Sequence, residues 1–196
     1  MNALKSKLSY LIIPTNIFIF AANAHPMTNS ILPLAIPGPS PIRNVIQAFA
    51  LKGFFFRNIP TLIWWGIRVE RLQDKEAVVV LPYSWRTRNP YHSAYFAAQA
   101  GAAELASGLL VTRACADLGP ISTLVTGFSA AFVKKANQSI WFTCSQGEEI
   151  RKTALDAINN GVAASITLQV TGVYQDGTPV SISHITWSMR SKKKQV

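Results

Sequence analysis

The sequence predicts an α+β domain in which an antiparallel sheet of about six strands wraps around one long helix. Residues 93–114 form a run of apolar and small side chains that is typical of a buried helix. The segments on either side are rich in β-branched and aromatic residues, which favour strands. Two of these segments are joined by Asp176-Gly177, a dipeptide typical of a tight hairpin turn.

The first half of the chain predicts an extra helix and two strands before the long helix. Apolar residues between Ile42 and Ala50 recur at helical spacing, and Pro60 ends that helix. Residues 61–82 then predict two strands joined by a turn at 73–75. A polar loop, residues 83–91, leads into the long helix.

The second half predicts four more strands and a short helix. Gly119-Pro120 ends the long helix region, and residues 122–135 and 138–146 have the composition of strands. Residues 147–161 predict a helix, with two acids at its start and Gly161 as its left-handed cap. Residues 162–190 predict the final two-stranded hairpin.

The long helix has no charged face between Ala94 and Gly108, so we expect neighbouring structure to bury it on all sides. Its small residues would let neighbouring backbones approach closely. One carboxylate, Glu104, interrupts this run. A transmembrane helix is the competing interpretation, and Glu104, Gln99 and the polar flanks argue against it.

Residues 1–40 predict an extension or targeting segment, and residues 41–196 predict the folded domain. The extension has a short basic start, an apolar middle and small residues at Ala22 and Ala24, as a secretory signal would. A translation start at Met27 and a genuine packing extension remain open alternatives. We expect a cytoplasmic protein, with export or membrane association through residues 1–24 as the alternative. Two cysteines predict free, buried thiols rather than a disulfide framework.

The charge balance predicts an anionic partner. Lys and Arg outnumber Asp and Glu by 19 to 9, for a net charge of +10. A phosphate-bearing small molecule or a membrane surface fits this charge. We expect no nucleic-acid partner, because no nucleic-acid motif is present and the basic residues are scattered apart from those in 190–194. No spacing of metal ligands is present, so we expect no metal, and no cofactor is predicted.

Residues 88–108 resemble the helix signature of the hotdog fold, in a subgroup related to acyl-CoA thioesterases. The subgroup pattern is roughly Asn-His-x-x-Ser-x-Tyr-Phe-Gly-Ala, followed by an acid eleven residues after the Ser and then a Gly. The matching residues are Asn89, Ser93, Tyr95, Phe96, Ala98, Glu104 and Gly108. Pro90 and Ala97 depart from the pattern, and His92 follows Pro90 two residues later. The resemblance covers residues 54–190.

The resemblance implies a hydrolase of acyl-CoA or another acyl thioester. Glu104 would be the general base or nucleophile. Asn89 and His92 would orient groups or transfer protons, and the backbone amides of Ser93, Ala94 and Tyr95 at the helix start would polarise the carbonyl. Each of these residues also has a structural interpretation. Glu104 would pair with Arg86, Arg88 or Arg113 at a subunit interface. Asn89 would form a turn, His92 would be an exposed loop residue, and Ser93 is favoured as an N-cap.

Helix geometry requires this site to be shared between two subunits. Ser93 and Glu104 lie on nearly the same helix face but roughly 16 Å apart along the axis. We therefore expect a homodimer with antiparallel helices, as the resemblance also implies, and leave a tetramer open. Arg86, Arg88, Lys134 and Lys135 are the candidates for binding the CoA phosphates. The rival function is a non-catalytic acyl-thioester or lipid binding protein of the same fold.

Overall fold

The structure is a computed structural model that describes residues 52–192. The predictions for residues 1–40 and for the helix between Ile42 and Ala50 lie outside these residues. Residues 52–58 are helical, where the first predicted helix was expected to end. The elements that follow are α2 (Pro60–Trp65), β1 (Arg68–Leu72), β2 (Ala77–Leu81), α3 (Phe96–Ala114), β3 (Ile121–Phe132), β4 (Ile140–Cys144), α4 (Gly147–Asn160), β5 (Ala164–Val173) and β6 (Pro179–Ser191).

The prediction of a strand from residue 61 was wrong, because Pro60–Trp65 forms the short helix α2. Pro60 stands at the first helical position, where its missing amide hydrogen costs nothing and its fixed φ suits the helix. Gly66 ends the helix in a left-handed conformation, with φ of 71°. The β-branched and aromatic residues between these two positions suggested a strand, but the cap residues decide the local structure.

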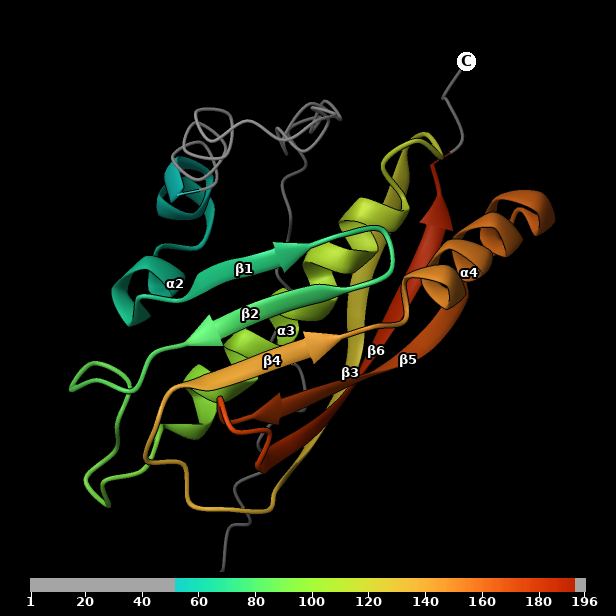
Figure 1. The fold of residues 1–196 in the computed structure, drawn as a ribbon. Helices are drawn as coiled ribbons and strands as arrows, with labels where there is room; N and C mark the ends of the chain where they lie inside the picture. Colours follow the sequence, from blue (N-terminus) through green and yellow to red (C-terminus); the bar gives the residue numbers. More distant parts are fainter. Residues whose placement is uncertain (1–51, 193–196) are drawn as a thin grey trace, which may run out of the picture. The chain divides into compact units, whose positions relative to one another are not determined.

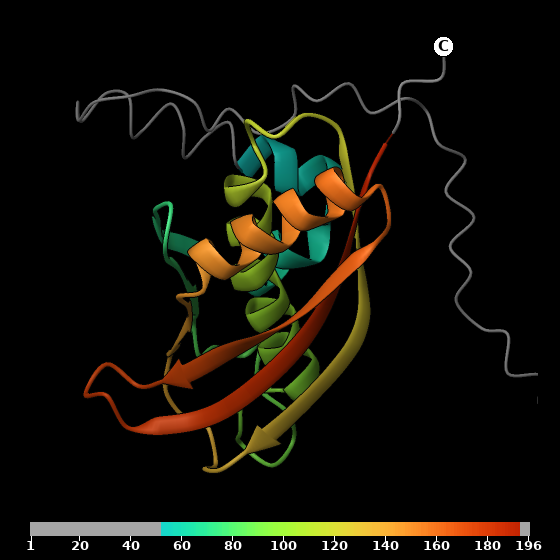
Figure 2. The same cartoon turned by 90° about the vertical axis from the view of Figure 1, so that its right-hand side faces the viewer.

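The six strands form one antiparallel sheet in the order β1-β2-β4-β5-β6-β3. Figure 1 shows α3 lying behind β2 and β4, and the turned view in Figure 2 shows the sheet curving around α3. This is the predicted hotdog arrangement of one long helix wrapped by an antiparallel sheet. Helix α4 connects β4 to β5 and packs against α3.

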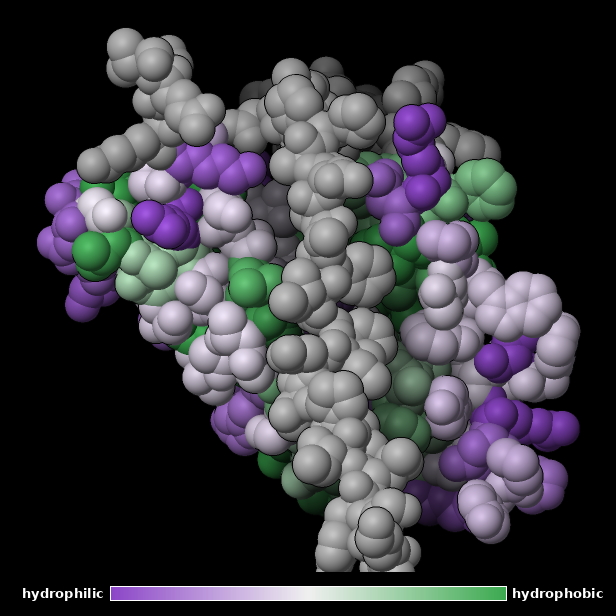
Figure 3. Space-filling view, turned by 180° about the vertical axis from the view of Figure 1, so that it is seen from behind, coloured by the Kyte–Doolittle hydropathy of each residue, from purple (hydrophilic) through white to green (hydrophobic). Residues whose placement is uncertain are grey.

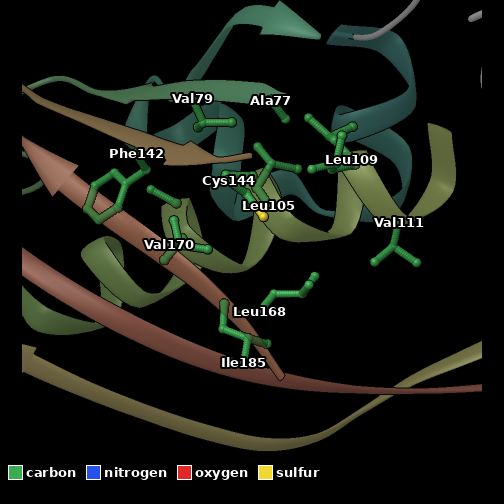
Figure 4. Close-up of a cluster of buried hydrophobic side chains, with 14 of the residues drawn as sticks. Ala77, Val79, Leu105, Leu109, Val111, Phe142, Cys144, Leu168, Val170 and Ile185 are labelled. Carbon is green, nitrogen blue, oxygen red and sulfur yellow. The ribbon is translucent and has the colours of Figure 1, made fainter. Parts of the chain in front are cut away.

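The core lies between the concave face of the sheet and α3. Strand β2 is buried at all five of its positions, and β4 and β6 alternate between buried and partly exposed residues. Figure 4 shows side chains from the sheet, such as Phe142 and Leu168, together with Leu105 and Leu109 of α3. Apolar burial of this kind supplies the main stabilisation of the fold.

Helix α3 is buried nearly all round, as its lack of a charged face predicts. Between residues 97 and 111 its partly exposed positions form one stripe, which consists of Ala97, Ala100, Gly101, Glu104 and Gly108. Aromatic rings lie against the two glycines of this stripe: a Cβ atom on Gly101 would lie 2.9 Å from the Trp65 ring, and one on Gly108 would lie 3.3 Å from the Trp187 ring. The glycines are therefore required for close packing.

The last predicted elements are confirmed. Helix α4 begins with Glu148 and Glu149 in its first turn and ends at Gly161, whose φ is 67°. The β5–β6 hairpin turns at Gly177, with φ of 84°. Both cysteines are free and buried, and burial raises the pKa of each thiol to about 11. Within residues 52–192, no helix combines the length and the apolar character that a membrane crossing requires.

Candidate functional site

The loop before α3 is organised by the side chain of Asn89. Its Oδ1 accepts hydrogen bonds from the backbone amides of Tyr91 (3.0 Å) and Ser93 (3.1 Å). His92 sits in this loop with a positive φ of 54°, and its backbone oxygen accepts a hydrogen bond from the Tyr83 hydroxyl. Asn89 therefore forms the turn that leads the chain into the helix. The His92 side chain is exposed and makes no hydrogen bond or ion pair in the described part of the chain.

The backbone amides of Ser93, Ala94 and Tyr95 are all hydrogen-bonded within the chain, which argues against their predicted role of polarising a carbonyl. They donate to Asn89 Oδ1 (3.1 Å), to the Ala136 carbonyl (2.6 Å) and to the Thr87 carbonyl (2.7 Å) respectively. The loop folds back on itself and packs against the segment after β3, so all three amides are hydrogen-bonded before the helix begins.

The prediction that Ser93 caps the helix was wrong. The N-cap is Tyr95, which has an extended conformation and makes no side-chain cap. The Ser93 hydroxyl instead accepts a hydrogen bond from the Ala136 amide at 3.2 Å. Helix α3 consequently starts at Phe96, three residues later than expected.

The free donors at the helix start belong to Phe96, Ala97 and Ala98. The first amides of a helix have no acceptor within it, and the first intrahelical bond of α3 is made by Gln99 to the Tyr95 carbonyl. Within residues 52–192, the three preceding amides have no acceptor. They point out of the positive end of the helix dipole, where a developing negative charge is stabilised.

Glu104 is partly buried on α3 and has no hydrogen-bond or ion-pair partner for its carboxylate among the described residues. Within this chain Arg113 pairs with Asp74 at 2.6 Å, and pairing of Glu104 with an arginine at a subunit interface stays a prediction. Burial raises the pKa of Glu104 above its ordinary value of 4.5. An unpaired carboxylate whose pKa is shifted upward by desolvation is typical of a general base.

Trp187 and Gly108 form the wall beside this carboxylate. Glu104 Oε1 and the Trp187 ring both lie within 3.4 Å of the position that a Cβ atom would take on Gly108. The indole is held in place because its Nε1 donates to the Ser107 hydroxyl at 3.1 Å. The apolar ring beside the carboxylate contributes to the desolvation that shifts its pKa.

A cavity of about 410 Å³ opens at the start of α3. Its walls come from the loop before the helix, the first turn of the helix, and the end of β3 with the segment that follows. The lining residues are Asn89, Tyr91, Ser93, Ala94, Phe96, Gln99, Phe132, Lys134 and Lys135. The cavity therefore combines the positive end of the helix with two lysines.

The two lysines reach the cavity through a short, well-anchored segment. The Tyr174 hydroxyl donates to the Lys135 carbonyl and accepts from the Asn137 amide, each at 2.9 Å. Lys134 Nζ lies 5.5 Å from the centre of the Tyr174 ring, within cation–π range. One buried tyrosine thus positions both basic side chains.

The predicted arginines lie elsewhere. The guanidinium of Arg86 lies over the Trp64 ring, 6.0 Å from its centre, and close to Gly66 at the end of α2. Arg88 is exposed and joins Ala94 in an isolated β-bridge. Neither lines the cavity.

The structure thus brings together Asn89, Ser93, Ala94, Lys134 and Lys135 at the cavity, while Glu104 lies further along the helix. Glu104 follows the free amides by six to eight residues, roughly 9–12 Å along the axis. Gln99 is a cavity residue that the sequence predictions did not include. The only signal for it was a polar residue inside an apolar helix. Among residues 52–192, no cluster of three His, Cys, Asp or Glu side chains has an arrangement that would hold a metal ion.

Comparisons with known proteins support the fold. The model of a family described as a domain of unknown function, DUF4442, matches residues 48–189. No match was found among curated proteins.

Several solved structures have the same fold at low sequence identity. One is a Pseudomonas aeruginosa protein of unknown function described as a probable thioesterase, at 22% identity and a TM-score of 0.63 over 74% of this chain and 96% of that one. A Chlorobaculum tepidum protein of unknown function has 16% identity and a TM-score of 0.63 over 74% and 94%. A Haemophilus influenzae thioesterase has 11% identity and a TM-score of 0.54 over 76% and 94%.

Proposed function

Because the chain belongs to the DUF4442 family and has the hotdog fold of thioesterase-like proteins, we propose that it hydrolyses acyl-CoA or another acyl thioester. The observation that carries the proposal is the unpaired carboxylate of Glu104, which is partly buried near the Trp187 ring and has a raised pKa. Glu104 acts as the general base that activates water or as the nucleophile that attacks the thioester carbonyl.

The free amides of Phe96, Ala97 and Ala98 stabilise the oxyanion that forms on the carbonyl oxygen. They replace the amides of Ser93, Ala94 and Tyr95, which are already paired. Asn89 acts indirectly, because it holds the loop in the shape that leaves the helix start open to the cavity. His92 is a candidate for orienting the leaving group, since its exposed side chain is free to turn.

Two protomers complete the site. Within one chain, the carboxylate and the amide donors are too far apart along α3 for both to contact one thioester group. Antiparallel α3 helices across a two-fold axis would place Glu104 of one subunit opposite the amides of the other.

Strand β3 is the surface that fits this dimer. It has twelve residues, pairs with β6 along one side, and forms one edge of the sheet. Its exposed large apolar residues are Leu124, Phe128 and Phe132. Figure 3 shows hydrophobic patches on the face of the molecule seen from behind. A long apolar edge strand is a template for pairing with another strand, and a second copy of β3 satisfies it.

Lys134 and Lys135 at the cavity, and Arg86 and Arg88 on the neighbouring loop, supply positive charge for the phosphates of CoA. In a dimer, the arginines of one subunit and the lysines of the other can serve the same ligand. Contact with a membrane through the N-terminal segment stays a prediction.

The test is hydrolysis of acyl-CoA esters over a series of chain lengths, with wild type and Glu104→Gln compared. We expect the variant to lose at least about 100-fold in kcat/KM, as is typical when a general base is removed. Glu149→Gln is the matched control, because Glu149 is exposed on α4. Equal binding by both proteins without turnover by either would instead favour the rival function, a non-catalytic acyl-thioester binding protein.

A further inference from the structure

Gln99 is buried on the first turns of α3 and lines the cavity, yet half of its amide has no partner. Only 4% of the residue is exposed. Its Nε2 donates to the Ala94 carbonyl at 3.0 Å, while its Oε1 is buried without a hydrogen bond. The Ala94 contact fixes the orientation of the amide, because only the nitrogen can donate to a carbonyl. The unpaired atom is therefore an acceptor.

A buried acceptor without a donor costs stability, typically about 1–3 kcal/mol. A methionine or leucine would fill the same volume without that cost, so packing alone does not account for a glutamine here. The neighbours of Gln99 on the cavity wall supply positive charge through Lys134, Lys135 and the start of α3. A carbonyl oxygen in this environment suits a ligand that brings its own N–H or O–H group.

We propose that Gln99 Oε1 accepts a hydrogen bond from an amide N–H of the ligand's thiol portion, and so selects pantetheine thioesters over simple alkyl thioesters. The inference rests on the proposed function for the identity of the ligand. In a pantetheine thioester, the nearest amide N–H lies only a few bonds from the sulfur. Gln99 lies about one helical turn from the free amide of Phe96, which binds the carbonyl oxygen. The spacing between the carbonyl oxygen and the amide N–H in such a ligand is compatible with the spacing between the Phe96 amide and the Gln99 side chain.

The experiment compares two probes in which a ketone replaces the thioester, so the proposed reaction cannot cleave either probe at that position. The first is hexanoyl-pantetheine with a methylene group in place of the thioester sulfur. The second is identical except that an ester oxygen replaces the amide N–H nearest that methylene. Calorimetry measures the binding of both probes to the full chain and to Gln99→Met. Gln138→Met is the matched control, because Gln138 is an exposed glutamine on the segment after β3.

We expect wild type and Gln138→Met to bind the amide probe about tenfold more tightly than the ester probe. Gln99→Met should bind the two probes equally, since it has no acceptor. A general disturbance of the fold would weaken both probes alike and leave the ratio unchanged, which would overturn the proposal. So would a wild-type ratio of one.

A second measurement needs no variant. The NMR resonance of the Gln99 side-chain carbonyl carbon in wild type should shift with the amide probe and not with the ester probe. An equal response to both probes would refute the role of Oε1 even if Gln99→Met fails to fold.

The outcome is separate from that of the proposed function. Hydrolysis of acyl-CoA with no effect of Gln99 on the probe ratio would leave the activity standing and remove this inference. A Gln99-dependent preference for the amide probe in a protein without turnover would support this inference and remove the proposed hydrolysis. That result would favour the binding function.

Discussion

Replacing Glu104 by Gln should make the free protein more stable at neutral pH, although it removes the proposed catalytic group. Burial raises the pKa of this carboxyl in the folded state above the ordinary value of 4.5 that applies when the chain is unfolded. Between these two values the folded chain holds a proton that the unfolded chain has lost. Stability therefore falls as the pH rises through this window, and above the window the cost of the buried charge is fully present.

The size of the effect follows from the surroundings of the carboxylate. The charge is partly buried near the Trp187 ring and has no hydrogen bond within residues 52–192. Glutamine keeps the shape but carries no charge, so we expect a gain of about 1 kcal/mol at neutral pH. For a chain of this size that corresponds to a rise in Tm of about 2–4 °C.

Differential scanning calorimetry measures this gain. The two proteins are compared at one protein concentration and at two pH values, one neutral and one below the ordinary pKa of the carboxyl. The difference in Tm between Glu104→Gln and wild type should vanish at the lower pH, where both states of the wild type are protonated. Glu149→Gln, at an exposed position, should shift stability by less than about 0.5 kcal/mol at either pH. A loss of stability in Glu104→Gln at neutral pH, or a gain that is independent of pH, would refute the reasoning.

Four further variants test the packing of α4 and of the candidate site. Gly147→Ala should lower the free energy of unfolding in urea by about 2–4 kcal/mol, because its Cβ would collide with the Asp74 carbonyl. Gly161→Ala should lower it by only about 1 kcal/mol, since its positive φ of 67° is strained but the space is open. Equal costs would contradict this. Tyr174→Phe should lower the free energy of unfolding by about 1–3 kcal/mol and weaken the binding of CoA measured by calorimetry. The reason is that it removes the hydroxyl that anchors the segment with Lys134 and Lys135. An unchanged affinity for CoA would argue against that anchoring. Trp187→Phe should move the pKa of the Glu104 carboxyl back toward its ordinary value in an NMR titration, since a smaller ring without the bond to Ser107 admits water. An unchanged pKa would show that the indole is not responsible.

Local composition was enough to predict most of the fold. The uncharged run of α3 required burial on all sides, and the β-branched segments required a sheet to provide it. Turn and cap residues such as Gly161 and Gly177 act through their own φ angles, so they could be recognised from the sequence. The error at Pro60–Trp65 has the same origin, because the caps of that short helix outweighed the strand propensity of the residues between them.

The site was less predictable than the fold, because it depends on which groups are already paired. Glu104 and Asn89 stood out as chemical types, but nothing in the sequence shows that the Ala136 and Thr87 carbonyls would consume the amides before the helix. The Thr87 carbonyl lies in the loop itself, but the Ala136 carbonyl comes from the segment between β3 and β4, and only tertiary packing brings it to the loop. The same is true of the unpaired oxygen of Gln99, whose burial depends on the cavity around it.

The sequence alone determined that one helix would be surrounded by strands and would carry a single acid, because burial and propensity act on each segment where it stands. The tertiary structure decided which donors stay free, which acceptor stays unpaired and which lysines reach the cavity. These properties belong to pairs of distant residues, since a hydrogen bond exists only once both partners have been brought within reach.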